Sequence, residues 1–215
     1  MTDNKLLNKI ANIAKNQQEM FPIRIIALRA LAKLDKTAEI ILKMPQESES
    51  FTLAIIQALG NTRDEIALDF LNNQLDELNK RKQIWREQKS NHWQYIQWET
   101  ELGYAITQIA PETNGIKMLS HNLAEVRKGA WLAIGRVGNM NIINILVKKY
   151  HESKPYQSYF RHATYRAIDA LINVEVRGNE QDLIELEELY KDVKHPGIKD
   201  RFDWTINQMD YRIRE

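Results

Sequence analysis

A helical pattern recurs along the chain, and it constrains the fold more than any other feature of the sequence. Residues 23–34 and 126–137 both read apolar-Arg-x-x-Ala-x-x-Ala-apolar-x-x-apolar. A third copy begins at Phe160-Arg161, and weaker copies are aligned at positions 49, 99 and 199. At 100° per residue, the apolar positions of this pattern fall on one face of a helix. One such helix cannot cover its own apolar face, so the repeat predicts stacked neighbouring helices.

Several copies end in a stop signal, and a second apolar-periodic segment follows. Gly60 and Gly138 each come after the last apolar residues of a copy, a position typical of a left-handed helix C-cap. Pro111 cannot continue a helix. The repeating unit is therefore predicted to be helix–turn–helix. The second helices are expected at residues 38–44, 65–78, 115–123, 142–150 and 183–190.

The strongest copy also carries a family resemblance. The run from Val126-Arg127 to Gly138-Asn139 resembles a HEAT repeat of the short, bilin-lyase-like variety. The resemblance implies an all-α fold, a right-handed α–α superhelix (HEAT-like solenoid) of about five to six helical pairs. Similar arrays occur in cyanobacterial bilin lyase subunits and in many bacterial signalling proteins. The chain departs from the family in lacking the usual Asp before most Val-Arg-type helices. The 50-residue interval between the copies at 49 and 99 is also too long for one unit.

We expect residues 1–215 to form a single repeat domain. Residues 1–16 are predicted to be an N-terminal capping helix, and residues 197–215 a C-terminal cap. Residues 79–97 fill the long interval and contain neither Gly nor Pro, so they are predicted to be a helical insertion.

Composition excludes several classes of function. Lys and Arg number 30 and Asp and Glu 29, a net charge of +1, which argues against a dedicated nucleic-acid or membrane-surface binder. The absence of cysteine excludes Cys-ligated metals, thiol nucleophiles and disulfides. The N-terminus lacks the continuous apolar run of a signal peptide, and no apolar stretch is long enough for a membrane span. We therefore expect a soluble cytoplasmic protein.

No motif of a catalytic, cofactor or metal site is present in the sequence. The five histidines do not form an H-E-x-x-H pair, and neither a Gly-rich phosphate loop nor a G-x-S-x-G motif occurs. These observations predict a non-catalytic protein without a cofactor or metal ion.

Aromatic and Arg residues recur four and five positions after the start of the repeat. By resemblance to HEAT arrays, these positions lie on the concave face, and Trp, Tyr and Arg are enriched at binding hot spots. We therefore predict a surface for a protein or peptide partner. The alternative is that some of these side chains are buried between helices or contact the 79–97 insertion. The predicted partner-binding residues are Tyr104, Trp131, Tyr165, Arg166 and Trp204.

The arginines at the start of the three strong copies are Arg24, Arg127 and Arg161. The resemblance implies that this Arg ties one repeat to its neighbour through hydrogen bonds and ion pairs. The alternative is a ligand-binding arginine.

The 79–97 insertion interleaves basic residues with aromatic ones. Such a segment can bind single-stranded nucleic acid or a phosphorylated partner. Alternatively, it is an amphipathic helix whose tryptophans dock on the stack while its lysines stay in water, and the net charge of +1 favours this alternative. The residues concerned are Lys80, Arg81, Lys82, Arg86 and Lys89, with Trp85, His92, Trp93, Tyr95 and the adjacent Trp98.

Two other functions remain as alternatives to a protein-binding scaffold. The resemblance allows a bilin lyase-like subunit or chaperone, with a tetrapyrrole and a phycobiliprotein as client. It also allows a HEAT-like nucleic-acid-binding protein or DNA glycosylase, for which Trp131 with Asp169, or Trp204 with Asp203, would supply the aromatic and the carboxylate.

Overall fold

The computed structural model describes residues 4–88, 93–153, 157–175 and 179–214. Helices make up 82% of the structure, and the described residues contain no strand. The expectation of an all-α fold is confirmed at this level. None of the described helices is both long and apolar enough to cross a membrane. The chain divides into two compact units, residues 1–110 and 111–215.

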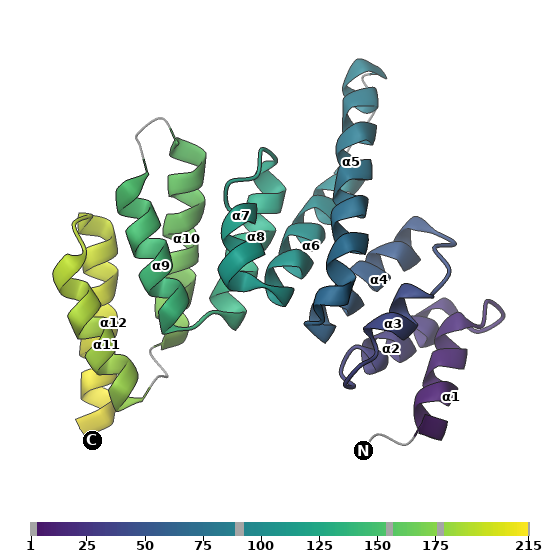
Figure 1. Ribbon diagram of the computed structural model, residues 1–215, viewed down its shortest axis with the longest axis horizontal. Coiled ribbons are helices and arrows are strands. Elements are labelled where there is room, and N and C mark those ends of the chain that lie inside the picture. Colours follow the sequence, from purple (N-terminus) through teal and green to yellow (C-terminus); the bar gives the residue numbers. More distant parts are fainter. Residues whose placement is uncertain (1–3, 89–92, 154–156, 176–178, 215) are drawn as a thin grey trace. The chain divides into compact units, whose positions relative to one another are not determined.

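Within its described residues, the first unit contains six α-helices and one 3₁₀ turn. They are α1 (Asn4–Lys15), α2 (Phe21–Leu31), α3 (Ala38–Leu42), α4 (Glu49–Thr62), η1 (Glu65–Ala67), α5 (Leu68–Gln88) and α6 (Trp93–Ile109). Helices α2, α4 and α6 pack one against the next, while α1 packs on α2, α3 on α4 and α5 on α6 (Figure 1). The buried faces of the middle helices, with Leu28, Phe51 and Ile106 fully covered, form the core.

The second unit repeats this two-layer arrangement. Its elements are the π-helical turn η2 (Pro111–Gly115), α7 (Ile116–Met118), α8 (Ala124–Val137), α9 (Met140–Glu152), α10 (Ser158–Glu175), α11 (Glu180–Asp192) and α12 (Pro196–Arg214). Helix α10 packs between α8 and α12, and α9 and α11 cover α10 and α12 in turn (Figure 1). Within each unit, the first helix of a predicted pair thus contacts the first helix of the next pair.

The predicted second helices agree with this structure, with shifted boundaries. Segment 38–44 contains α3, 142–150 lies within α9, and 183–190 lies within α11. The 115–123 segment contains only the short α7, because Pro111 starts a wide π-helical turn before it. The 79–97 insertion divides between the end of α5 and the start of α6. The segments predicted as N-terminal and C-terminal caps contain α1 and α12. That residues 1–215 form a single repeat domain stays a prediction.

Side-chain caps account for several helix starts. Ser48 accepts a hydrogen bond from the backbone N–H of Phe51 at 3.2 Å, and Asn139 accepts one from that of Ile142 at 3.1 Å. At α11, Asn179 and Asp182 form a reciprocal capping box. Each cap satisfies N–H groups that have no partner inside the helix.

The prediction of left-handed glycine caps is wrong at both sites. No described glycine has a positive φ. Helix α4 continues through Gly60 to Thr62 and is capped by Arg63 in the left-handed conformation, while Gly138 is extended, with φ −70° and ψ 170°. The reason for glycine at Gly60 is helix packing, because a Cβ placed there would lie 2.7 Å from the Cα of Ala105 on α6.

The same close approach occurs in the second unit. A Cβ placed on Gly135 of α8 would lie 2.4 Å from the Cβ of Ala170 on α10. Each unit therefore has one glycine at which two first helices come nearly into backbone contact. Such approach needs a residue without a side chain, since packed interiors leave no room for an extra methyl group.

Candidate functional site

The structure places the five predicted partner-binding residues in four different surroundings. Tyr104 lies on α6 in the first unit, whereas the other four lie on α8, α10 and α12 in the second. Trp131 and Arg166 line one groove. Tyr165 and Trp204 do not line it. The structure therefore brings together two of the four predicted residues that share a unit.

Charged side chains from two adjacent helices line the α8–α10 groove. It begins at the first turn of α8 and crosses to the exposed side of α10. Trp131 is half-buried, while Arg166 and His162 are exposed. The lining residues are Ala124, Glu125, Arg127, Lys128, Trp131, His162, Ala163 and Arg166.

An exposed aromatic side chain lies next to the groove. The Tyr159 ring, 73% exposed at the start of α10, has the guanidinium carbon of Arg127 4.8 Å from its centroid. Arg127 also donates to the backbone oxygens of His121 at 2.6 Å and Asn122 at 3.0 Å. These bonds fix the guanidinium, which in turn provides a cation–π partner for Tyr159.

Sequence reasoning missed Lys128, His162 and Tyr159 as members of this surface. Lys128 and His162 each follow the template arginine directly, at the same position of two copies. A residue three or four positions before Trp131 or Arg166 shares its helix face. This spacing is the sequence signal that could have identified Lys128 and His162. Tyr159 precedes the repeat template, so the repeat gave no signal for it.

Tyr165 packs into a separate aromatic cluster at the loop before α12. Its ring centroid lies 6.1 Å from that of His195, which is also 5.2 Å from that of Tyr150 on α9. Both contacts are edge-to-face, and Tyr165 is half-buried. The partner-binding role of Tyr165 stays a prediction.

The same cluster holds a histidine with a shifted pKa. His151 accepts a hydrogen bond at Nε2 from the backbone N–H of Lys194, at 3.3 Å. Burial lowers the pKa of His151 below its ordinary value, and the charges of Lys194, His195 and Arg161 lower it further. The neutral imidazole is therefore the form that this structure favours.

Trp204 lies on α12 with 47% of its surface exposed. Near it, Arg201 forms an ion pair with Asp169 of α10, with Nε and Oδ1 3.0 Å apart. Asp169 is thus already paired, and it does not line the groove that contains Trp131.

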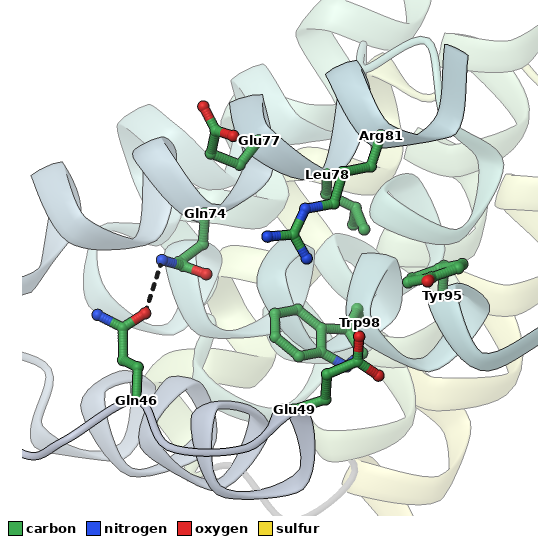
Figure 2. A pocket seen from close by; sticks show the side chains of 8 residues that line it. All are labelled: Gln46, Glu49, Gln74, Glu77, Leu78, Arg81, Tyr95 and Trp98. Atoms are coloured by element: carbon green, nitrogen blue, oxygen red, sulfur yellow. Dashed lines mark hydrogen bonds between the residues drawn. The ribbon is translucent and has the colours of Figure 1, made fainter. Parts of the chain in front are cut away.

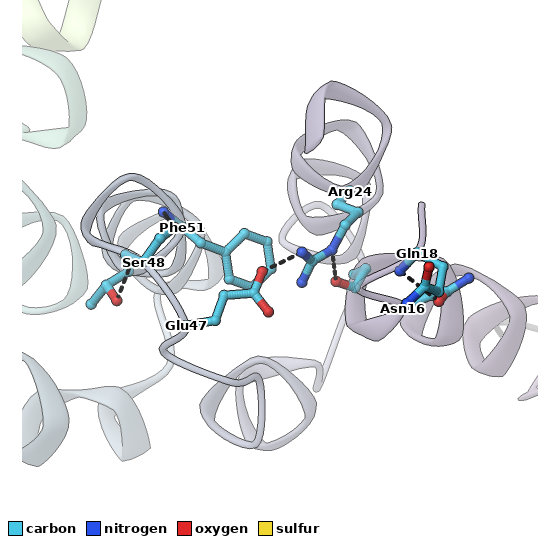
Figure 3. Close-up of polar contacts among 8 residues, drawn as sticks. Asn16, Gln18, Arg24, Glu47, Ser48 and Phe51 are labelled. Atoms are coloured by element: carbon cyan, nitrogen blue, oxygen red, sulfur yellow. Dashed lines mark hydrogen bonds and ion pairs between the residues drawn. The ribbon is translucent and has the colours of Figure 1, made fainter. Parts of the chain in front are cut away.

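The three template arginines contact neighbouring elements. Arg24 is buried, donates to the carbonyl of Ala14 on α1 at 3.0 Å, pairs with Glu47 and lies over the ring of Phe51 on α4 (Figure 3). Arg161 lies over Tyr150 on α9, 4.9 Å from the ring centroid. Their inter-repeat role, and that of Arg127, stays a prediction that these contacts support.

A second pocket lies in the first unit, between the start of α4, the middle of α5 and the start of α6. Figure 2 shows Arg81 and Glu49 pointing toward the Trp98 indole, and Gln74 donating to Gln46 at 3.2 Å. The pocket holds about 100 Å³. Small-molecule sites usually hold about 300 Å³ or more, so this pocket fits at most one side chain of a partner.

The basic residues of the insertion are mostly engaged where the structure describes them. Lys80 pairs with Glu77 at 2.8 Å, and Lys82 with the buried Glu99 at 2.5 Å. The Glu77 contact raises the pKa of Lys80 through a hydrogen bond and charge attraction. The side chains of Trp85, Arg86, Lys89, His92 and Trp93 lie outside the described residues.

The described residues contain no cluster of three or more His, Asp or Glu that could hold a metal ion. The chain matches no protein-family model and no curated protein. The chemistry of the α8–α10 groove is therefore the main guide to function.

Proposed function

We propose that the chain is a non-catalytic module of the HEAT-like helical-repeat type that binds a protein or peptide partner through the α8–α10 groove. The proposal includes a right-handed superhelix of about five to six helical pairs. The two-layer packing of paired helices within each unit supports it.

The observation that carries the binding function is the meeting of Trp131 and Arg166 in one open groove. They come from different helices and lie four and five positions after the template arginine of two copies of the repeat. Trp and Arg are the residue types that most often carry binding energy at protein interfaces, and exposed Tyr159 adds a third aromatic or cationic group beside them. No geometric feature of the described residues favours the lyase or glycosylase alternatives.

A display selection of random 12-residue peptides on the full chain tests this function. Affinities of the enriched peptides are then measured by fluorescence anisotropy for the wild type and for Trp131→Ala. We expect at least a tenfold loss, because truncation of a hot-spot tryptophan costs about 2 kcal/mol or more. Tyr211→Ala, which removes an exposed aromatic of α12 outside the groove, is the matched control and should bind normally.

Circular dichroism and thermal melting establish that both variants fold. An equal affinity of wild type and folded Trp131→Ala for every enriched peptide would overturn the proposal. A selection that enriches no peptide would overturn it as well.

A further inference from the structure

We infer that the occupant of the α8–α10 groove is an acidic, extended segment of a partner protein, whose carboxylates pair with Lys128 and Arg166. This inference rests on the proposed function and specifies the chemistry of the partner. Its basis is the charge of the groove and the availability of two of its cations.

The groove concentrates positive charge. Its lining contains Arg127, Lys128 and Arg166 against the single carboxylate of Glu125, a net +2 with His162 neutral. The whole chain has a net charge of only +1. The groove therefore differs from the average surface and attracts an anionic partner.

The three cations differ in what already binds them. Arg127 is held by two backbone oxygens and by Tyr159, so it acts as a fixed support. Arg166 is exposed and forms no ion pair with any other described residue. Because the planar guanidinium can bind a carboxylate through two parallel hydrogen bonds, Arg166 is a ready partner for a glutamate or aspartate side chain.

Lys128 is also available to a partner. Its Nζ lies 3.5 Å from a carboxylate oxygen of Glu125 one turn earlier, and its side chain is 52% exposed. An exposed pair of this kind contributes little to stability, so a carboxylate from a partner can replace Glu125 at little cost. Lys128 and Arg166 then offer two cations from two adjacent helices.

The remaining lining indicates a peptide rather than a small metabolite. Five of the eight lining residues are charged or histidine, and the other three are Trp131 and two alanines. Metabolite pockets are predominantly apolar and enclose their ligand. The Trp131 ring offers a face for an apolar side chain or a peptide plane beside the paired carboxylates.

A nucleic acid is the competing anion, and the charge distribution disfavours it. Residues 111–215 carry 16 Lys and Arg and 15 Asp and Glu, so this unit has no extended basic surface. Helix α11 of the same unit has six acidic residues and one lysine, a net −5. Nucleic-acid binding needs many phosphate contacts, whereas a segment with a few carboxylates needs only the local pair of cations.

The test compares three labelled probes by fluorescence anisotropy with the full chain. The first is a 12-residue peptide of glutamate, glycine, serine and leucine, the second has every Glu replaced by Gln, and the third is a 12-nucleotide oligothymidylate. We expect the Glu peptide to bind at least tenfold more tightly than the other two at low salt. The double variant K128E/R166E should lose at least tenfold in affinity for it.

A matched control separates local pairing from net charge. The double variant K148E/K149E reverses two exposed cations of α9 outside the groove and so changes the net charge as much as K128E/R166E does. When both variants are compared at about 0.15 M salt, it should retain the wild-type affinity within about threefold, because screening then weakens charge effects that do not come from direct pairing. A version of the peptide with Lys in place of Glu should bind K128E/R166E more tightly than it binds the wild type. Circular dichroism confirms folding of each variant.

Three results would overturn the inference. They are equal binding of the Glu and Gln peptides, unchanged binding of the Glu peptide by K128E/R166E, and tighter binding of the oligonucleotide than of the Glu peptide. Its failure can be told apart from that of the proposed function. If the display selection enriches neutral or basic peptides whose binding depends on Trp131, the groove is still a binding site. That result would rule out only the acidic character of the partner.

Discussion

The guanidinium carbon of Arg24 lies 4.3 Å from the centroid of the buried Phe51 ring. Phe21 meets the same ring edge-on, at 6.3 Å between centroids. Arg24 thus links three helices at once, because it also binds the Ala14 carbonyl of α1 and the Glu47 carboxylate before α4. An arginine in this position satisfies polar groups that the packed helices would otherwise leave without partners.

Arg24→Met should therefore lower the free energy of unfolding by about 3 kcal/mol, as expected when one member of a largely buried pair is removed. Urea unfolding followed by circular dichroism measures this change. Arg29→Met, an exposed arginine on the same helix, is the matched control and should change stability by about 0.5 kcal/mol or less. Equal effects of the two substitutions would contradict the structural role of Arg24.

The pair between Lys82 and Glu99 gives a second prediction. Glu99 is 2% exposed, so Lys82→Met would leave a buried carboxylate without its counter-ion. We expect Lys82→Met to lower the free energy of unfolding by about 3 kcal/mol. The double variant with Lys82→Met and Glu99→Leu also removes the carboxylate, so it should recover most of this loss. Lys80→Met removes an exposed pair and should cost about 1 kcal/mol or less. Chemical unfolding of the four proteins tests this order, and a Lys80 effect as large as that of Lys82 would refute it.

Helix packing at Gly135 gives a third prediction. Gly135→Ala should destabilise the chain by about 1–2 kcal/mol, because the new methyl group would collide with Ala170 although alanine favours the helix. Ala170→Gly removes the opposing methyl group, so the two substitutions together should cost less than the sum of their separate effects. A double-mutant cycle of unfolding free energies measures this coupling, and simple additivity would contradict the close approach.

The lowered pKa of His151 predicts a pH dependence of stability. In the unfolded chain the imidazole binds a proton near its ordinary pKa of 6.5, whereas burial and the neighbouring Lys194 lower that pKa in the folded chain. Below pH 6.5 the unfolded state therefore binds more protons, and folding stability falls as the pH falls. His151→Gln should make this decrease shallower between pH 7 and about 5.5. Urea unfolding curves of the wild type and His151→Gln at a series of pH values measure this change, and an identical pH dependence of the two proteins would disprove the assignment.

The spacing of apolar residues predicts the helices, because burial of one face per helix is a local property of the sequence. The repeat register includes Trp131 and Arg166 among five predicted partner-binding residues, but it does not single out these two as a pair. It does not reveal that Tyr165, next to Arg166 in the chain, turns to His195 instead. Adjacent helical residues point about 100° apart, and only the neighbouring helix decides which of them it covers.

The glycines show the same division between local and tertiary causes. Gly60 precedes a polar Asn and follows an apolar run, so its sequence context is that of a helix end. The structure instead uses it in the interior of α4, where Ala105 of α6 fills the space of the missing side chain. Local residue patterns thus dictate an all-helical, repeated chain with a cationic and aromatic strip. Which members of that strip form a groove depends on lateral helix packing, because that packing joins residues far apart in the chain.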